Sequence, residues 1–163
     1  MAKQVAGNTA VALDTLAATR AFGSRLGRLL CPGDVILLQG GLGAGKTTLT
    51  QAIAQGLAVP DDYYVSSPSF ALLHEYPGRL PLYHMDCYRL TGEDDVEGAG
   101  LLDYLESCDG VCVIEWPERL GTLMPDDHLA ITLTPGQGEE RQLELVARGR
   151  AWQERWQEIL SIC

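Results

Sequence analysis

The stretch from Gly40 to Thr47 limits the possible folds of this chain more than any other feature. Its letters, GGLGAGKT, satisfy the pattern G-x-x-x-x-G-K-[ST], which forms a phosphate-binding loop when it follows a strand and opens a helix. Both flanks have that character, because the apolar run 35–38 precedes the loop and apolar residues at helical spacing follow it until Pro60. We therefore predict a strand, a phosphate-binding loop (P-loop) and a helix, in that order.

The chemistry of this loop is the binding of a nucleoside triphosphate. Glycines let the backbone curve around phosphate oxygens, and the N-terminus of the next helix adds partial positive charge. Lys46 is expected to reach the β and γ phosphates, and the Thr47 hydroxyl to bind the Mg²⁺ that bridges them. The chain has only two lysines, and neither lies in the Asn/Thr-Lys-x-Asp motif that reads guanine, which favours ATP. The predicted nucleotide-binding residues of the loop are Gly41, Leu42, Gly43, Ala44, Gly45, Lys46, Thr47 and Thr48.

Hydrophobic periodicity and turn signals predict the remaining elements. In order, they are a helix over 14–30, a β-hairpin of 69–76 and 80–86 around Pro77-Gly78, a short acidic helix within 93–109, a buried strand 111–114, a hairpin of 129–134 and 142–147, and a final amphipathic helix with Trp152, Trp156, Ile159 and Leu160. No repeat or linker divides the chain. We therefore expect one domain over residues 1–163, an α/β, three-layer P-loop NTPase domain with a mixed sheet.

Two carboxylates end predicted strands in the manner that a P-loop enzyme needs. Asp86 ends the strand LPLYHMD, and Glu115 ends the strand VCVIE. Carboxylates at the carboxyl ends of strands beside the P-loop hold the magnesium shell and orient a water molecule. The pattern leaves open which of the two serves the metal and which serves the water.

Composition excludes several classes of function. The 22 acidic residues outnumber the 12 basic ones, and the resulting net charge of -10 disfavours direct binding to nucleic acid or to anionic lipid. The five cysteines lack CxxC spacing, so we expect them to be reduced and to form neither a zinc site nor a disulfide framework. No apolar run reaches the roughly 18 residues of a membrane span, and the predicted location is cytoplasmic.

Four motifs occur together in one order: GGLGAGKTTLTQAIA, SSPSFALLHEY, LPLYHMDCYRL and VIEWPERL. In this combination the chain resembles the TsaE family, small bacterial P-loop ATPases required for threonylcarbamoyladenosine at position 37 of tRNA. The resemblance covers residues 14–147, and the pair HxDxYRL and EWP is more specific than the P-loop.

The resemblance implies ATP and Mg²⁺ as ligands, TsaB and TsaD as partners, and contact with tRNA only through those partners. It implies Mg²⁺-linked roles for Thr47 and Asp86, phosphate contact by Lys46, and a catalytic carboxylate at Glu115 that also lies near the metal. Trp116 lies beside that carboxylate in the sequence. Ser69, in the switch-like segment 67–70, is expected to sense the γ-phosphate. The chain departs from the family pattern in having Gly41 where Asp is frequent and Ser69 where Thr is usual.

Other interpretations compete with this one. A small-molecule P-loop kinase would need an arginine-rich lid, and arginines 79, 89 and 119 are single and dispersed. A nucleotide-gated binding module would bind ATP without using its hydrolysis. His84 shares a strand face with Asp86 and is either a core histidine or a catalytic one. Trp116 either lines the site, meets a partner or packs in the core, and Tyr88 and Arg89 are candidates for phosphate contact.

Overall fold

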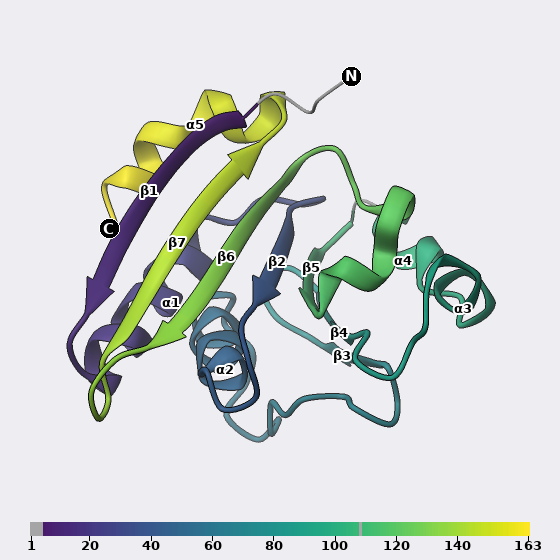
Figure 1. The fold of residues 1–163 in the computed structure, drawn as a ribbon, viewed down its shortest axis with the longest axis horizontal. Coiled ribbons are helices and arrows are strands. Elements are labelled where there is room, and N and C mark those ends of the chain that lie inside the picture. Colours follow the sequence, from purple (N-terminus) through teal and green to yellow (C-terminus); the bar gives the residue numbers. More distant parts are fainter. Residues whose placement is uncertain (1–4, 108) are drawn as a thin grey trace.

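The computed structural model describes residues 5–107 and 109–163, so Cys108, one of the five cysteines predicted to be reduced, lies outside the described residues. Within the described residues, seven strands form one sheet in the order β1-β7-β6-β2-β5-β4-β3, with helices packed on it (Figure 1). The strands are β1 (Val5–Leu13), β2 (Val35–Gln39), β3 (Leu73–Tyr76), β4 (Leu82–Asp86), β5 (Val111–Glu115), β6 (His128–Pro135) and β7 (Arg141–Arg148). The helices are α1 (Leu16–Leu29), α2 (Lys46–Gly56), α3 (Glu93–Gly98), α4 (Leu102–Ser107) and α5 (Arg150–Leu160), with a 3-10 helix, η1 (Pro117–Leu123).

The sheet is mixed, as the sequence predicts. Its centre is parallel, because β2 pairs with β5 and β6, and β4 pairs with β5, all in parallel. The outer pairs β1–β7, β6–β7 and β3–β4 are antiparallel. The carboxyl ends of β2, β4 and β5 therefore meet at one edge of the sheet, which is where ligands bind in open α/β folds.

Two apolar layers hold the helices on the sheet. On one face, α1, α2 and α5 bury residues such as Leu26, Leu49 and Trp152 against β2, β6 and β7. On the other face, η1, α3 and α4 cover only the half of the sheet made by β2, β4 and β5, around Leu37 and Leu120. The arrangement has three layers over that half. On this second face, Asn8, Ala10 and Ala12 of β1 and Gln142 and Glu144 of β7 are exposed instead.

The two helices that flank the P-loop approach each other closely. A Cβ atom built on Gly27 of α1 would lie 2.3 Å from the carbonyl oxygen of Ile53, and one built on Gly56 of α2 would lie 2.2 Å from that of Ser24. Only glycine allows this spacing of the two backbones. The crossing fixes the position of α2, which begins with the P-loop lysine.

An ion pair ties α5 to the start of β2. The Arg155 guanidinium donates to both oxygens of Asp34, at 3.0 Å from Nη1 to Oδ2 and at 2.5 Å from Nη2 to Oδ1. Asp34 is 6% exposed and also accepts a hydrogen bond from the Cys31 amide at 2.7 Å. Both oxygens of this buried carboxylate therefore accept hydrogen bonds.

Several boundaries differ from the prediction. Residues 5–13 form the edge strand β1, although the sequence predicted no element there. The segment 93–109 contains two short helices, because Gly100 between them has φ +73° and breaks the helical path. The first hairpin strand begins at Leu73 and not at Ser69, because Leu72 has φ 67° and the chain before it turns.

Two expectations about the whole chain are addressed by the described residues only. None of the described helices is long and apolar enough to cross a membrane. The four cysteines within 5–107 and 109–163 form no disulfide with one another.

Candidate functional site

The P-loop connects β2 to α2 as its motif predicts. Gly43 and Gly45 have backbone φ values of +77° and +107°, which residues other than glycine rarely adopt. Lys46 is 7% exposed, and its ammonium donates to the carbonyls of Gly40 at 2.5 Å and Gly41 at 3.1 Å. The loop therefore curls around its own lysine at the N-terminus of α2.

Asp86 and Glu115 lie side by side at the sheet edge that faces this loop. They are direct partners in the parallel register of β4 and β5, and each is 3% exposed. Asp86 Oδ1 accepts the Tyr88 amide at 2.9 Å. Two carboxylates buried so close together need hydrogen-bond donors or a cation to offset their charge.

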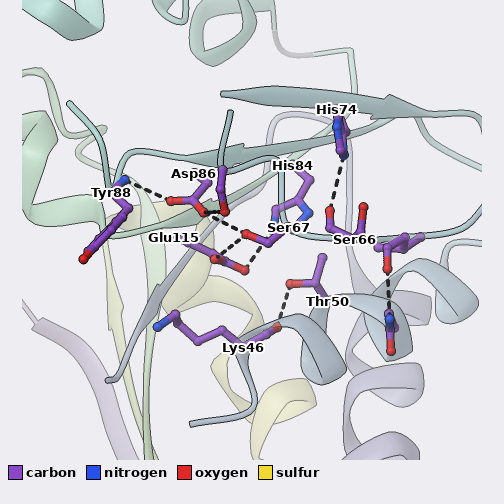
Figure 2. Close-up of polar contacts among 12 residues, drawn as sticks. Lys46, Thr50, Ser66, Ser67, His74, His84, Asp86, Tyr88 and Glu115 are labelled. Atoms are coloured by element: carbon purple, nitrogen blue, oxygen red, sulfur yellow. Dashed lines mark hydrogen bonds and ion pairs between the residues drawn. The ribbon is translucent and has the colours of Figure 1, made fainter. Parts of the chain in front are cut away.

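Ser67 lies between the two carboxylates (Figure 2). Its hydroxyl oxygen is 2.7 Å from Asp86 Oδ2 and 3.2 Å from Glu115 Oε2. The Ser69 hydroxyl is 3.3 Å from the same Asp86 oxygen. A serine hydroxyl has one hydrogen, so Ser67 can donate to only one carboxylate at a time. The sequence pointed to Ser69 and missed Ser67, although both belong to the segment SSPSF.

His84 is joined to the same network. Its ring is fully buried, and Nε2 lies 3.2 Å from Glu115 Oε1. Because a carboxylate oxygen accepts, Nε2 carries the hydrogen in this contact. Nδ1 has no hydrogen-bond partner among the described residues. His84 is thus a core histidine that also holds the carboxylate predicted to be catalytic.

Aromatic side chains lie beside the lysine and at the rim of the site. The Trp116 ring centroid lies 4.5 Å from Lys46 Nζ and 5.0 Å from the ring of Tyr88. Trp116 has φ 55°, a strained value for a bulky residue, directly after the strand that carries Glu115. At the rim, the Arg89 guanidinium lies 3.9 Å from the Phe70 ring, and Phe70 is 83% exposed.

These elements enclose a cleft of about 560 Å³. The cleft is lined by the residues predicted to bind the nucleotide, hold the metal or act in catalysis: Gly41, Leu42, Gly43, Ala44, Gly45, Lys46, Thr47, Thr48, Ser69, Asp86, Glu115 and Trp116. Tyr88 and Arg89, the candidates for phosphate contact, also line it, as do Ser67, Phe70 and Arg141, whereas His84 is not among the lining residues. The structure brings the predicted residues together, and their individual roles stay predictions.

Oxygen donors dominate the site. The hydroxyl of Thr47 and the carboxylates of Asp86 and Glu115 are ligand types that suit Mg²⁺. No group of three His, Cys, Asp or Glu side chains within the described parts of the chain is placed to hold a metal alone. This donor set fits a magnesium ion that takes its remaining ligands from nucleotide phosphates and water.

Gly41, where the family pattern often has Asp, is an open position. A Cβ atom there would meet nothing within 4 Å. A side chain would therefore have room at this position, and the departure removes a charge from the cleft.

Comparisons with known proteins agree with one another. A family model described as threonylcarbamoyl adenosine biosynthesis protein TsaE matches residues 13–143. The tRNA threonylcarbamoyladenosine biosynthesis protein TsaE of Bacillus subtilis is 39% identical over 136 residues, which cover 83% of each chain. The protein of that name from Treponema pallidum is 44% identical over 115 residues, covering 71% of this chain and 83% of the relative. The crystal structure of Bacillus subtilis YdiB superposes with a TM-score of 0.79 at 31% identity and covers 97% of both chains.

Proposed function

Because this chain belongs to the TsaE family, whose proteins serve the biosynthesis of threonylcarbamoyladenosine in tRNA, we propose that it binds Mg-ATP and hydrolyses it to ADP and phosphate. The main support for this proposal is that three charged side chains line one cleft. The P-loop lysine, the buried Asp86 and the buried Glu115 come from separate elements and line the same space.

Lys46 and the P-loop bind the phosphates in this proposal. The lysine ammonium exchanges its contacts with the carbonyls of Gly40 and Gly41 for phosphate oxygens, which are better partners because they carry full charge. The Trp116 ring beside Nζ excludes water from one side of the lysine, which strengthens its attraction for phosphate. Thr47 and Asp86, with Glu115 nearby, would hold Mg²⁺, which would offset negative charge on the terminal phosphates.

Glu115 is the group that orients and activates the attacking water. The water oxygen forms a bond to the γ-phosphorus, the bond from that phosphorus to the β–γ bridging oxygen breaks, ADP leaves, and the water proton passes to a carboxylate oxygen of Glu115. His84 holds Oε1 at 3.2 Å. Oε2, which faces Ser67 at 3.2 Å, becomes the proton acceptor when the Ser67 hydroxyl donates to Asp86 instead.

The proposed biological role is to support the turnover of TsaB and TsaD during threonylcarbamoylation of tRNA. The net charge of -10 agrees with contact to tRNA through partners and not directly.

The test is release of phosphate from Mg-ATP by the purified chain, alone and with TsaB and TsaD of the same organism. Glu115→Gln keeps the shape of the side chain and removes its capacity to take a proton, so we expect kcat to fall about 10²- to 10⁴-fold while ATP still binds. Glu97→Gln, at an exposed position of α3, is the matched control and should leave the rate unchanged. Equal rates for wild type and Glu115→Gln would refute the hydrolytic role, and ADP formed without free phosphate in the presence of an acceptor would indicate a kinase.

A further inference from the structure

We propose that a groove beside the P-loop helix docks a lysine or arginine side chain of a protein partner. The groove lies between the second half of α2 and the segment 59–65, and its volume is about 270 Å³. It shares no lining residue with the large cleft, so the two spaces can be occupied independently. The inference therefore goes beyond the proposed function and does not depend on it.

Two tyrosines form the outer wall of this groove. Tyr64 is 82% exposed, Tyr63 is 46% exposed, and both line the space. Tyrosine is enriched in protein–protein interfaces, because its ring buries a large apolar area when a partner covers it. The face of the ring also attracts a cation. The wall thus suits a side chain that has an apolar stem and a positive end.

The charge on the groove is negative. Asp61 lines it, and Asp62 follows directly in the sequence, both at exposed positions. The amide side chains of Gln51 and Gln55 add neutral polar groups. No lysine, arginine or histidine is among the described residues that line the groove. A basic side chain from outside would therefore complement both the aromatic wall and the carboxylate.

Hydrogen bonds fix the shape of the groove. The Gln51 side-chain amide donates from Nε2 to the Val65 carbonyl at 2.9 Å, which ties the segment to α2. The Tyr63 amide donates to the Pro60 carbonyl at 3.0 Å, which closes the turn that carries the tyrosines. Because the walls are held before a partner arrives, little conformational freedom is lost on binding.

Size and charge disfavour other occupants. The volume of about 270 Å³ is below the roughly 300–1,000 Å³ of clefts that hold small-molecule ligands. Nucleic acid would bring phosphates toward Asp61 on a chain whose net charge is -10. A second copy of this chain would bring the same net charge. A basic side chain on a different protein is the occupant that these observations favour.

The groove lies along the segment that leads to the proposed active site. From Val65 the chain continues through Ser66, whose amide donates to the Tyr76 hydroxyl at 3.3 Å. Ser67 follows and lies 2.7 Å from Asp86 Oδ2 (Figure 2). A partner docked in the groove would therefore contact the segment that reaches the buried carboxylates.

The test titrates the isotope-labelled chain with acetyl-Ala-Arg-Ala-amide and follows the backbone amide resonances by NMR. An ionic strength of about 0.15 M screens non-specific attraction to the acidic surface. A matched peptide carries citrulline, which keeps the size of arginine and removes its charge. The groove variants are Asp61→Asn and Tyr64→Ala, both at exposed positions where the fold should be kept.

The matched control variant is Asp94→Asn in α3. Asp94 is exposed and lines a different hollow, whose described lining residues, 91–95, include three acids and no aromatic ring. The control therefore removes one negative charge, as Asp61→Asn does, from an acidic site that lacks the aromatic wall.

We expect the arginine peptide to shift the resonances of residues 59–65 saturably, and the citrulline peptide to bind about fivefold more weakly or not at all. Asp61→Asn and Tyr64→Ala should each raise the Kd about three- to fivefold, whereas Asp94→Asn should leave it unchanged. Equal binding of the two peptides, or an unchanged Kd in both groove variants, would overturn the inference.

Two other results would refute it by identifying a different occupant. Shifts of the 59–65 resonances that grow with protein concentration, without any peptide, would show that a second copy fills the groove. Saturable shifts of the same resonances by an oligothymidine, at least as strong as those by the arginine peptide, would show a nucleic-acid site.

Discussion

Substituting Gly27 by alanine tests whether the close crossing of α1 and α2 holds the P-loop helix in place. The added Cβ would lie 2.3 Å from the Ile53 carbonyl oxygen and 2.9 Å from Gly56 Cα, both backbone atoms. The first distance falls about 1.1 Å short of the 3.4 Å at which ordinary contact begins. Because a helix backbone cannot yield locally, the two helices must separate by roughly that amount.

A separation of this size weakens the packing of Leu26 against Leu49 and Ile53, all three of them fully buried. Overpacking of a well-packed core costs about 1 to 3 kcal/mol, and the upper end applies where backbone opposes backbone. Alanine regains about 1 kcal/mol in helix propensity. We therefore expect Gly27→Ala to lower the free energy of unfolding by about 2 kcal/mol, or Tm by about 4–8 °C for a chain of this length.

Urea and thermal unfolding, followed by circular dichroism, measure the effect. The matched control is Gly98→Ala at the end of α3, where an added Cβ meets nothing within 4 Å and stability should rise by about 0.5 kcal/mol. Since α2 begins with Lys46, Gly27→Ala should also weaken ATP binding. If Gly27→Ala is as stable as Gly98→Ala, the helices are free to move apart and the close crossing is not what positions the loop.

Three further predictions concern buried polar groups. His84→Leu removes the hydrogen-bond donor to Glu115 and should lower kcat of ATP hydrolysis about 10- to 100-fold with little change in KM. His84→Gln keeps a donor and should retain most of kcat. Equal losses of kcat in the two variants would contradict a positioning role for His84. Arg155→Met leaves the Asp34 carboxylate buried without its cationic partner and should lower the free energy of unfolding, measured by urea titration, by about 3 kcal/mol. Arg155→Lys keeps the charge but cannot make both hydrogen bonds, so its loss should be smaller. An Arg155→Met protein as stable as wild type would contradict this prediction. Burial raises the pKa of the Cys87 thiol from its usual 9.0 to about 12, so the folded chain keeps a proton that the unfolded chain releases. The stability from this group is complete below pH 9 and is lost as the pH rises toward 12, by up to about 1.4 kcal/mol per pH unit, and Cys87→Ala should flatten the decline measured between pH 9 and 10.

The parts of the fold that the sequence predicts are those determined by local pattern. The P-loop motif, the apolar run of β2 and the helical spacing after Lys46 are all contained within about twenty residues. Asp86 and Glu115 could also be placed, because each ends an apolar strand. In the structure these strands pair in parallel, and the carboxylates become neighbours.

The edge strand β1 could not be predicted, because the residues that stabilise it lie far along the chain. It is built largely from small residues, and its pairing partner is β7, which begins at Arg141. An added Cβ on Gly7 would lie 2.3 Å from the Trp156 ring of α5. Contacts with residues at least 128 positions away, the separation of Leu13 and Arg141, therefore determine this strand, and they leave no local signal.

The division of roles between Asp86 and Glu115 depends on partners that no local pattern reveals. In the structure the two carboxylates differ, because Asp86 meets two hydroxyls and an amide, whereas Glu115 meets one hydroxyl and the buried His84. Ser67 belongs to a segment without helix or strand, and its single hydrogen can be donated to either acid but to only one at a time. A movement of this segment that gave the hydrogen to Asp86 alone would free one oxygen of Glu115 to accept a proton. We therefore expect the path of the loop, and not the strand pattern, to determine which carboxylate acts as the base in the proposed hydrolysis.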